Sequence, residues 1–140
     1  MLSEKSIRKY LNKFCQNLEI EVFESIDSTN NYVRKKAADG VAQGFVAISS
    51  EQTAGRGRRG RKFYSPKDSG VYLSILLRPS NFDASKAGNI TAMAAVAVCE
   101  AIETVSEKAA GIKWVNDVYM DGKKVSGILT EASFDSDGKE

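Results

Sequence analysis

The chain has 140 residues, of which 42% are hydrophobic and 27% are charged, as in an ordinary globular protein that buries one core. It contains no histidine, which excludes Ser–His and Cys–His nucleophilic sites and, with Cys15 and Cys99 as the two thiols, the usual zinc sites. The cysteines lie far apart, so two reduced, buried thiols in a cytoplasmic protein are expected, with one disulfide as the alternative. No apolar run long enough to span a bilayer is evident, which predicts no membrane association.

The net charge of +2 conceals a local concentration of positive charge. Five cations and no acid occupy residues 56–62, namely Arg56, Arg58, Arg59, Arg61 and Lys62. A protein that coats nucleic acid would spread its basic residues over a face or along a helix. The concentration in one segment favours a loop that encloses a small polyanion, because arginine forks bind phosphate and carboxylate oxygens in pairs. A disordered basic segment or a nucleic-acid contact is the alternative.

The first half of the chain predicts two helices and three strands. Helical spacing of apolar residues predicts a helix over residues 3–18, with Ser3 as its N-cap. A second helix is expected from Asp27 or Ser28 to Gly40. The strands are expected at residues 20–26, 45–51 and 71–78, the last with Val71, Leu73, Ile75 and Leu77 alternating along one face.

The second half predicts one long helix followed by a hairpin. Residues 86–107 are Ala-rich and apolar around most of the helix circumference, which predicts a helix packed deep against a sheet. A strand is expected at residues 111–115, followed by a hairpin whose turn is Asp121–Gly122, a pair that favours positive φ. The second arm of the hairpin is expected to run through Val125, Ile128 and Leu129 towards Phe134.

The segment from Gln52 to Gly70 has no apolar periodicity and is expected to be a long functional loop. Residues 55–60 (GRGRRG) fit the G-x-G-x-x-G dinucleotide fingerprint. That fingerprint requires a helix immediately afterwards, which Pro66 and Gly70 prevent. A Walker A loop is also excluded, because Lys62 falls one position late and no Ser or Thr follows it.

Two shorter motifs carry groups able to bind a polar ligand. Residues 113–117 (KWVND) are followed after a tight turn by Lys124. Strand alternation would send Lys113 and Asp117 to one face unless the turn breaks the register. Lys124 would point towards that face, with a surface ion pair to Asp117 as the ordinary alternative. Residues 27–30 (DSTN) would bond a small polar ligand or serve only as a helix N-cap.

Taken together, four segments resemble the catalytic domain of biotin–protein ligases, the enzymes that activate biotin with ATP. The segments are residues 27–32 (DSTNNY), 51–66 (EQTAGRGRRGRKFYSP), 113–119 (KWVNDVY) and 123–131 (KKVSGILTE). They occur in the family's order with about its spacing, and the basic loop is close to diagnostic. The resemblance implies an α+β fold of the class II aminoacyl-tRNA-synthetase-like, biotin–lipoate ligase-like type. In that fold a mixed, mostly antiparallel sheet is packed on one side by helices.

The resemblance also implies a reaction. The biotin carboxylate attacks the α-phosphorus of MgATP to give biotinyl-5′-adenylate and pyrophosphate, and a lysine of biotin carboxyl carrier protein then displaces AMP. Biotin, ATP and Mg²⁺ are therefore the implied substrates and ion. Such an in-line transfer needs alignment and charge neutralisation rather than a strong base, which suits a chain without histidine.

Site residues follow from the matching motifs, again as implications of the resemblance. Those implied for biotin are Ser28, Thr29, Gln52, Gly55, Arg56, Arg58, Lys124 and Gly127. Those implied for ATP are Arg56, Arg61, Phe63, Asn116, Asp117 and Lys124. The implied catalytic residues are Lys124, which contacts both the biotin carboxylate and the α-phosphate, with Arg58 and Asp117. Asp117 is also the implied contact to Mg²⁺, through ATP.

The chain departs from the family pattern at Val115, where the family usually has proline, and at Phe63, where it usually has tryptophan. Both residues keep apolar bulk. The resemblance covers residues 20–134 and implies one domain over residues 1–140, the N-terminal portion of the catalytic domain. The family's further strands and C-terminal β-domain would follow Glu140, and the winged-helix domain of some members is expected to be absent. We therefore expect most of the biotin pocket, weak or no ligase activity, and no DNA binding.

Three alternatives stay open on the sequence. The first is a lipoate or octanoate ligase or transferase, although the arginine–glycine loop and the KWVND run favour biotin. The second is a biotin-binding fragment without turnover, and the third is a nucleic-acid-binding module that uses the basic loop. A cytoplasmic protein is expected, and a homodimer is compatible with the sequence.

Overall fold

The computed structural model describes residues 2–80 and 86–133. The chain forms two compact units. The first comprises Met1–Arg56 and Gly60–Pro79, and the second comprises Gly57–Arg59 and Ser80–Glu140. The arginine-rich loop therefore contributes residues to both units.

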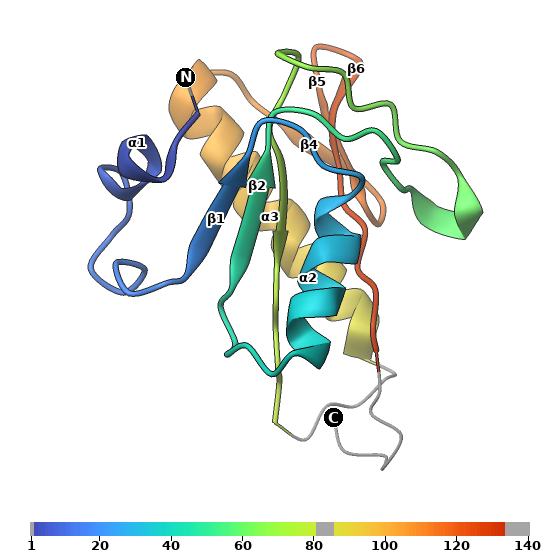
Figure 1. The fold of residues 1–140 in the computed structure, drawn as a ribbon. Helices are drawn as coiled ribbons and strands as arrows, with labels where there is room; N and C mark the ends of the chain where they lie inside the picture. The colour runs from blue at the N-terminus through green and yellow to red at the C-terminus, as the bar shows by residue number, and fades with distance from the viewer. Residues whose placement is uncertain (1, 81–85, 134–140) are drawn as a thin grey trace. The chain divides into compact units, whose positions relative to one another are not determined.

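The first unit is built on a three-stranded sheet in the order β1-β2-β3. Its strands are β1 at Ile20–Phe23, β2 at Val46–Ser49 and β3 at Tyr72–Ile75. β1 runs parallel to β2, and β3 runs antiparallel to β2. The helix α2, Thr29–Ala38, connects β1 to β2 and packs against β2 and β3 (Figure 1). The three strands and α2 fall within the ranges predicted from the sequence.

The central strand β2 is buried along its whole length. Successive side chains of a strand point to opposite faces of the sheet, and here both faces are covered. On one face, Val46 and Ile48 pack against the N-terminal segment. The contacting side chains of that segment are Leu2, Ile7, Leu11 and Leu18. On the other face, Ala47 packs in a cluster with Val33 of α2. The core of the unit therefore holds β2 firmly, and with it the residues that follow β2.

The N-terminal helix is much shorter than predicted. α1 covers Glu4–Arg8 instead of residues 3–18. Ser3 caps it as expected, since its hydroxyl accepts from the backbone N–H of Ser6 (3.2 Å). Beyond α1 the chain turns, and Tyr10 and Phe14 are 90% and 82% exposed. The helical spacing of these two aromatic residues was therefore misleading.

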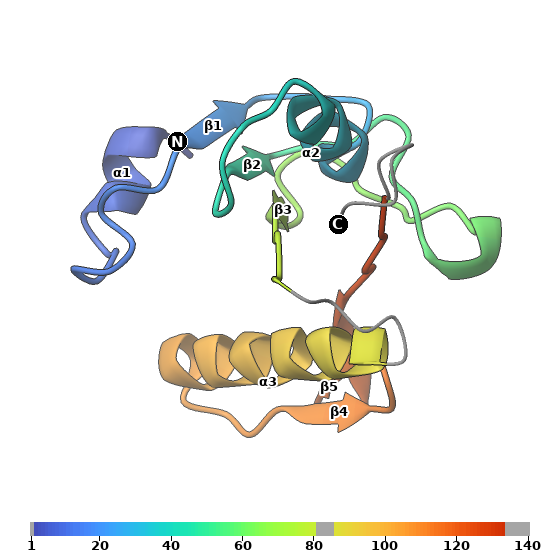
Figure 2. The same cartoon turned by 90° about the horizontal axis from the view of Figure 1, so that it is seen from below.

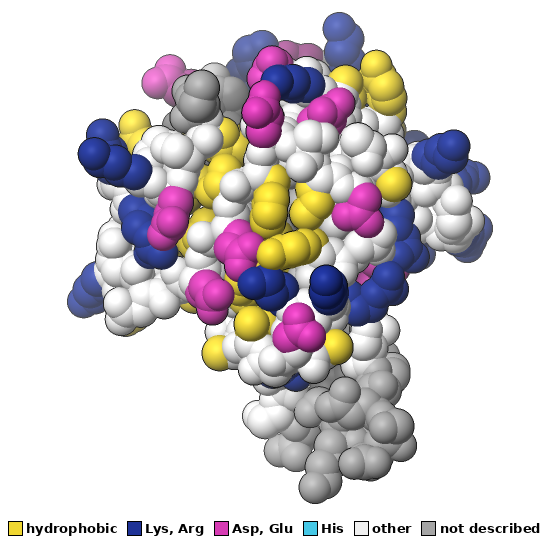
Figure 3. All heavy atoms as spheres, viewed as in Figure 1, with side chains coloured by type: hydrophobic (Ala, Val, Ile, Leu, Met, Phe, Trp, Pro, Cys, Tyr) yellow, Lys and Arg dark blue, Asp and Glu magenta, His cyan; other side chains and the backbone are white. Residues whose placement is uncertain are grey.

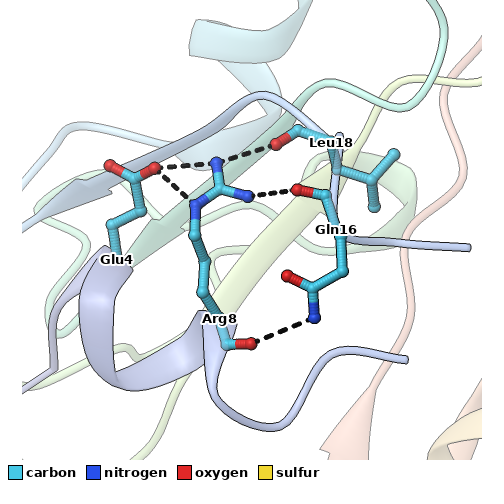
Figure 4. Close-up of polar contacts among 4 residues, drawn as sticks. All are labelled: Glu4, Arg8, Gln16 and Leu18. Carbon is cyan, nitrogen blue, oxygen red and sulfur yellow. Dashed lines mark hydrogen bonds and ion pairs between the residues drawn. The ribbon is translucent and has the colours of Figure 1, made fainter. Parts of the chain in front are cut away.

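Arg8 accounts for the early end of α1. Its guanidinium donates to the backbone carbonyls of Gln16 (2.7 Å) and Leu18 (3.0 Å) (Figure 4). It also forms an ion pair with Glu4 (2.7 Å). These bonds fold the chain back on α1 and satisfy carbonyl groups that lie outside a helix. Long-range side-chain contacts replace the helical hydrogen bonds that local spacing predicted.

The second unit joins one long helix to a three-stranded antiparallel sheet in the order β4-β5-β6. α3 covers Ala87–Ser106 and lies along β4 and β5 (Figure 2). The strands are β4 at Gly111–Lys113, β5 at Asp117–Met120 and β6 at Lys123–Gly127. The turn between β5 and β6 is Asp121–Gly122, with φ of 51° and 72°, which confirms the predicted positive-φ turn.

The second arm of this hairpin is shorter than predicted. Val125 lies in β6, but β6 ends at Gly127, so Ile128 and Leu129 follow the strand rather than extend it. Phe134, the expected end of the arm, lies outside the described residues.

α3 is less buried than its composition predicted. Ala95 and Cys99 are its buried residues, whereas Met93 and Val105 are 71% and 87% exposed. The strands that α3 contacts, β4 and β5, have three and four residues and cover little of a helix of twenty residues. α3 is also long and apolar enough to cross a membrane by length and composition alone, which corrects the expectation that the chain has no such segment. One such helix is weak evidence of a membrane span, because core helices of soluble proteins can have the same length and composition.

Both cysteines are free thiols, as the sequence predicted. Cys99 is buried in α3, and this burial raises the pKa of its thiol. Cys15 is half-buried rather than buried.

Candidate functional site

The N-terminus of α2 carries the first group of predicted ligand-binding residues. Ser28 is the N-cap, and its hydroxyl accepts from the backbone N–H of Asn31 (3.5 Å). Ser28 and Thr29 are 2% and 3% exposed. The side-chain amide of Asn31 donates to the carboxylate of Asp27 (3.0 Å), and this bond, helped by a backbone bond from Ser28, lowers the pKa of Asp27. The DSTN motif is a helix cap, and its hydroxyls are also buried among other polar groups.

Gln52 joins this group from the segment after β2. Thr29 donates to Gln52 Oε1 twice, from its backbone nitrogen (2.9 Å) and from its hydroxyl (3.0 Å). Because β1 and β2 are parallel, the segments that follow them leave the sheet at the same edge, and a parallel bridge between Ile26 and Gln52 continues the pairing. The fold therefore brings Ser28, Thr29 and Gln52 together, as their common predicted role requires.

Gly55 marks the point where the basic loop lies closest to this polar group. Its carbonyl accepts from the backbone N–H of Phe63 (2.9 Å), and the residue is buried. A Cβ at Gly55 would lie 2.4 Å from the carbonyl oxygen of Phe63 and 2.5 Å from the hydroxyl of Ser65. Any side chain would collide with backbone there, so this position requires glycine for close approach of two chain segments. Phe63 itself is half-buried.

The cations of the basic loop differ in their surroundings. Arg56 pairs across the loop with Lys62 in an antiparallel bridge, and its guanidinium donates to Asn31 Oδ1 (2.9 Å) at the start of α2. Arg61 and Lys62 are exposed. Lys and Arg side chains project at the edge of the molecule where the loop lies (Figure 3). Arg56 is thus anchored to the first turn of α2, whereas Arg61 is exposed.

The second group of predicted residues lies in the second unit and is charged. Arg58 Nη1 donates to Asn116 Oδ1 (3.0 Å), and Asn116 Nδ2 donates to Asp117 Oδ1 (3.1 Å). The same carboxylate oxygen forms an ion pair with Lys124 Nζ (2.7 Å). Asn116 is held in turn by Ile128, whose backbone N–H donates to the Asn116 carbonyl (2.8 Å). Four residues from three segments therefore form one continuous polar cluster, the Arg58–Lys124 cluster.

The Arg58–Lys124 cluster is open to solvent. The side chains of Lys124 and Asp117 are 39% and 23% exposed. Asp117 is the first residue of β5 and lies opposite Gly127, the last residue of β6. The hairpin thus places the charged groups at one end of the sheet, where an anionic ligand would meet two cations held by neutral and acidic partners.

Lys113 and Asp117 lie on the same face of the sheet, as predicted, because they are directly paired across β4 and β5. β4 ends at Lys113, the chain turns, and β5 begins at Asp117, so the two residues face each other across an antiparallel pair. The turn interrupts the predicted alternation along residues 113–117, so the shared face arises from this pairing. Lys113 Nζ lies 5.4 Å from the centre of the Tyr119 ring, in a cation–π contact.

Two polar residues of the first group were missed by the sequence reasoning. Ser74 of β3 donates to Thr29 Oγ1 (2.8 Å), and Ser65 accepts from Gln52 Nε2 (3.1 Å). Both serines are buried, at 8% and 3% exposure. A signal was present for Ser74, because a serine interrupts an otherwise apolar strand (YLSI). Ser65 lies in the motif FYSP and gave no local sign of its contact.

The described residues contain no group of three or more Asp, Glu, Cys or His side chains arranged to hold a metal ion. Asp117 supplies one carboxylate, which already accepts from Asn116 and Lys124. Mg²⁺ is commonly held by one or two carboxylates together with substrate phosphates. The residues present therefore fit an ion that arrives with a nucleotide, and they do not form a separate metal site.

Comparisons with known proteins identify the family of the chain. The model of the biotin/lipoate A/B protein ligase family matches residues 22–139. The bifunctional ligase/repressor BirA of Bacillus subtilis is 35% identical over 97% of the chain, and the biotin–[acetyl-CoA-carboxylase] ligase of Mycobacterium tuberculosis is 33% identical over 82%. The solved structure of Aquifex aeolicus biotin protein ligase in complex with biotin and ATP has a TM-score of 0.70 and 36% identity, over 82% of the chain.

The chain therefore belongs to the biotin/lipoate A/B protein ligase family. Its relatives named above are biotin–protein ligases, as the four motifs predicted, and the chain has the predicted class II synthetase-like α+β fold, which it shares with the solved ligase. The chain spans 42% and 45% of the two curated relatives and 47% of the solved chain.

Proposed function

We propose that this chain binds biotin and ATP and forms biotinyl-5′-adenylate, whose biotinyl group passes to a lysine of a biotin carboxyl carrier protein. The observation that carries the proposal is the Arg58–Lys124 cluster, in which the basic loop and the KWVND motif meet through hydrogen bonds. Two motifs separated by more than fifty residues would have no reason to meet if each were an isolated surface feature.

The charges of the cluster suit adenylate formation. The biotin carboxylate would attack the α-phosphorus, the bond from that phosphorus to the bridging oxygen would break, and pyrophosphate would leave. Lys124 is assigned to the biotin carboxylate and the α-phosphate, whose mutual repulsion it would neutralise. Asp117 and Asn116 would hold Lys124 and Arg58 in place before the ligand arrives, so that little reorganisation is needed.

The polar group of the first unit is assigned to the ureido ring of biotin. Ser28, Thr29 and Gln52 offer buried neutral donors and acceptors, which suit the ureido ring. Arg56 would reach the biotin carboxylate together with the backbone at Gly55. The further assignments, each carried over from the matching motif, are Gly127 for biotin and Arg61 and Phe63 for ATP.

Mg²⁺ would enter with ATP, held mainly by the phosphates with Asp117 as the protein contact. The acceptor lysine would attack the acyl carbonyl of the adenylate, and AMP would leave with its phosphate. The proposal places the protein in the cytoplasm, where biotin, ATP and the carrier protein are present together.

Calorimetric titration with biotin and, separately, with lipoate tests the ligand. We expect heat of binding from biotin and none from lipoate. Pyrophosphate release measured with MgATP and biotin together, and with each alone, tests the reaction; we expect release with the complete mixture. A response to lipoate alone would overturn the choice of ligand. A DNA gel shift that persists at physiological salt, without any biotin response, would overturn the proposed function.

A further inference from the structure

A directed chain of hydrogen bonds runs through the polar group of the first unit. Ser74 Oγ donates to Thr29 Oγ1 (2.8 Å), and Thr29 Oγ1 donates to Gln52 Oε1 (3.0 Å). Gln52 Nε2 then donates to Ser65 Oγ (3.1 Å), and Ser65 Oγ donates to the carbonyl of Phe63 (3.1 Å). The chain links β3, the start of α2, the segment after β2 and the returning arm of the basic loop. We call it the serine-to-serine chain.

The direction of the serine-to-serine chain follows from the number of hydrogens. A hydroxyl carries one hydrogen, so it donates once and accepts with its remaining lone pairs. At one end of Gln52 the backbone N–H of Thr29 can only donate, so it requires the oxygen Oε1 there. The Thr29 hydroxyl donates to the same oxygen, and Ser74 Oγ, which contacts both Thr29 Oγ1 and Asn30 Oδ1, holds that hydroxyl in place. The hydrogen of Ser65 goes to the Phe63 carbonyl, and its oxygen therefore accepts from the Gln52 amide. Both ends of the chain impose the same orientation on the Gln52 carboxamide.

Burial makes this orientation costly to reverse. Thr29, Ser65 and Ser74 are 3%, 3% and 8% exposed, so water cannot readily replace a lost partner. Reversal of the Gln52 carboxamide would set its amide group against the backbone N–H of Thr29, donor against donor, and would leave two oxygens facing each other at Ser65. Gly55 also closes the space from the side of the loop, since a Cβ there would lie 3.2 Å from Gln52 Nε2.

We propose that Ser65 and Ser74 are positioning residues for biotin recognition. They hold the Gln52 carboxamide with Oε1 towards Thr29 and leave the second hydrogen of Nε2 to meet an acceptor atom of the ligand. A carboxamide free to rotate would present an oxygen at that place for part of the time and would repel the same acceptor. The inference rests on the proposed function, since it requires that this polar group binds biotin.

The first test is biotin affinity by calorimetry for Ser65→Ala and Ser74→Ala. Each variant is expected to bind about five- to tenfold more weakly, the size of one lost buried hydrogen bond. Ser49→Ala is the matched control. Ser49 is a fully buried serine of β2 whose hydroxyl donates to the Glu51 carbonyl (2.6 Å), outside the serine-to-serine chain. The affinity of Ser49→Ala for biotin is expected to stay within about twofold of that of the unmodified chain.

The second test asks whether Ser65 acts through Gln52. In a double-mutant cycle, Ser65→Ala is expected to cause no further loss of affinity once Gln52 is replaced by alanine. A purely structural role of Ser65 would instead add its own loss in both backgrounds. The side-chain amide protons of Gln52, identified by their absence from the NMR spectrum of Gln52→Ala, provide a ligand-free measurement. Their signals are expected to shift in Ser65→Ala and to stay in place in Ser49→Ala.

The outcomes separate the inference from the proposed function. Biotin binding that is as strong in Ser65→Ala and Ser74→Ala as in Ser49→Ala would overturn the positioning role alone. Additive losses in the double-mutant cycle, or unmoved Gln52 signals, would do the same. No binding of biotin by the unmodified chain would reject the proposed function, and the assignment of these serines to biotin would fall with it.

Discussion

The predicted ligand-binding residues form two groups that are built on different physical principles. In the first unit, hydroxyls and a carboxamide are buried, neutral and bonded to one another in a fixed direction. In the second unit, two cations, one carboxylate and one amide form the Arg58–Lys124 cluster, whose central ion pair is partly exposed. The hydrogen bonds of the first group join its own members, whereas the charges of the second group remain accessible to a ligand.

This difference indicates which properties of the protein a mutation in each group would change. A buried neutral network depends on packing, so small changes in volume or hydrogen bonding alter both stability and ligand fit. A half-exposed ionic cluster contributes little to stability, because solvent screens it, but it acts strongly on a ligand that brings negative charge. Mutations in the two units should therefore separate stability from catalysis.

The largest effect is expected from Lys124→Ala. The charge that Lys124 neutralises develops mainly in the transition state, so adenylate formation should fall about 100- to 1000-fold, while biotin affinity falls much less. The melting temperature should change little, since the side chain is 39% exposed. Pyrophosphate release and calorimetry measure the two quantities, and Lys123→Ala, at the neighbouring exposed lysine of β6, is the control. Equal losses of affinity and rate would contradict the assigned role.

Gly55→Ala is expected to show the opposite pattern. The new methyl group would meet the Phe63 carbonyl and the Ser65 hydroxyl, so the free energy of unfolding should fall by about 1–3 kcal/mol and biotin binding should weaken with it. Denaturant unfolding measures the first change. Gly88→Ala in α3 is the control, because a Cβ there meets nothing within 4 Å and alanine favours a helix. A Gly55→Ala protein as stable as the unmodified chain would show that the close approach is not required.

Arg58→Lys tests whether the cluster needs the planar guanidinium or only positive charge. Arg58 reaches Asn116 with one nitrogen and keeps other N–H donors for a ligand. Lysine lacks this fork, so adenylate formation should fall about tenfold with unchanged stability. Arg59→Lys is the neighbouring control. If Arg58→Lys formed the adenylate as fast as the unmodified chain, the residue would contribute only its positive charge.

The smallest effect concerns Glu21, which lies outside both groups. Its carboxylate pairs with Lys36 (2.5 Å) and accepts from the hydroxyl of Tyr32 (2.6 Å), and these bonds, that of Lys36 first, lower the pKa of Glu21. A carboxyl group with a lowered pKa stabilises the fold above its ordinary pKa near 4.5, and that stability is lost as the pH falls through this range. Glu21→Gln should therefore be less stable than the unmodified chain at pH 7, and the difference should shrink towards pH 3.

Urea unfolding over this pH range measures the effect, and Glu19→Gln, at a neighbouring exposed carboxyl, is the control. The hydrogen bond from Tyr32 to Glu21 raises the pKa of Tyr32, so the stability that this tyrosine contributes is lost as the pH rises into the alkaline range. A difference between Glu21→Gln and the unmodified chain that stays constant from pH 7 to pH 3 would contradict the role of this ion pair.

Much of the candidate site was predictable, because its motifs are short and contiguous. The segments that hold Ser28, Gln52, Arg58, Asp117 and Lys124 are recognisable in sequence, and the structure brings them into two groups. The prediction failed where a residue acts through a distant partner. Ser65 lies inside the basic-loop segment and Ser74 in β3, but no role was predicted for either, because their contacts to Gln52 and Thr29 depend on how β3 and the loop return to the sheet.

The sequence by itself determined the family, the capped start of α2 at Asp27 or Ser28 and the hairpin turn at Asp121–Gly122, because capping, turn conformation and motif spacing are properties of a few neighbouring residues. Only the tertiary structure decided that α1 ends at Arg8, that Gly55 allows no side chain, and that α3 keeps an exposed apolar surface. These features follow from contacts between segments far apart in the chain. Such contacts depend on the packing of the whole unit, which local preference does not specify.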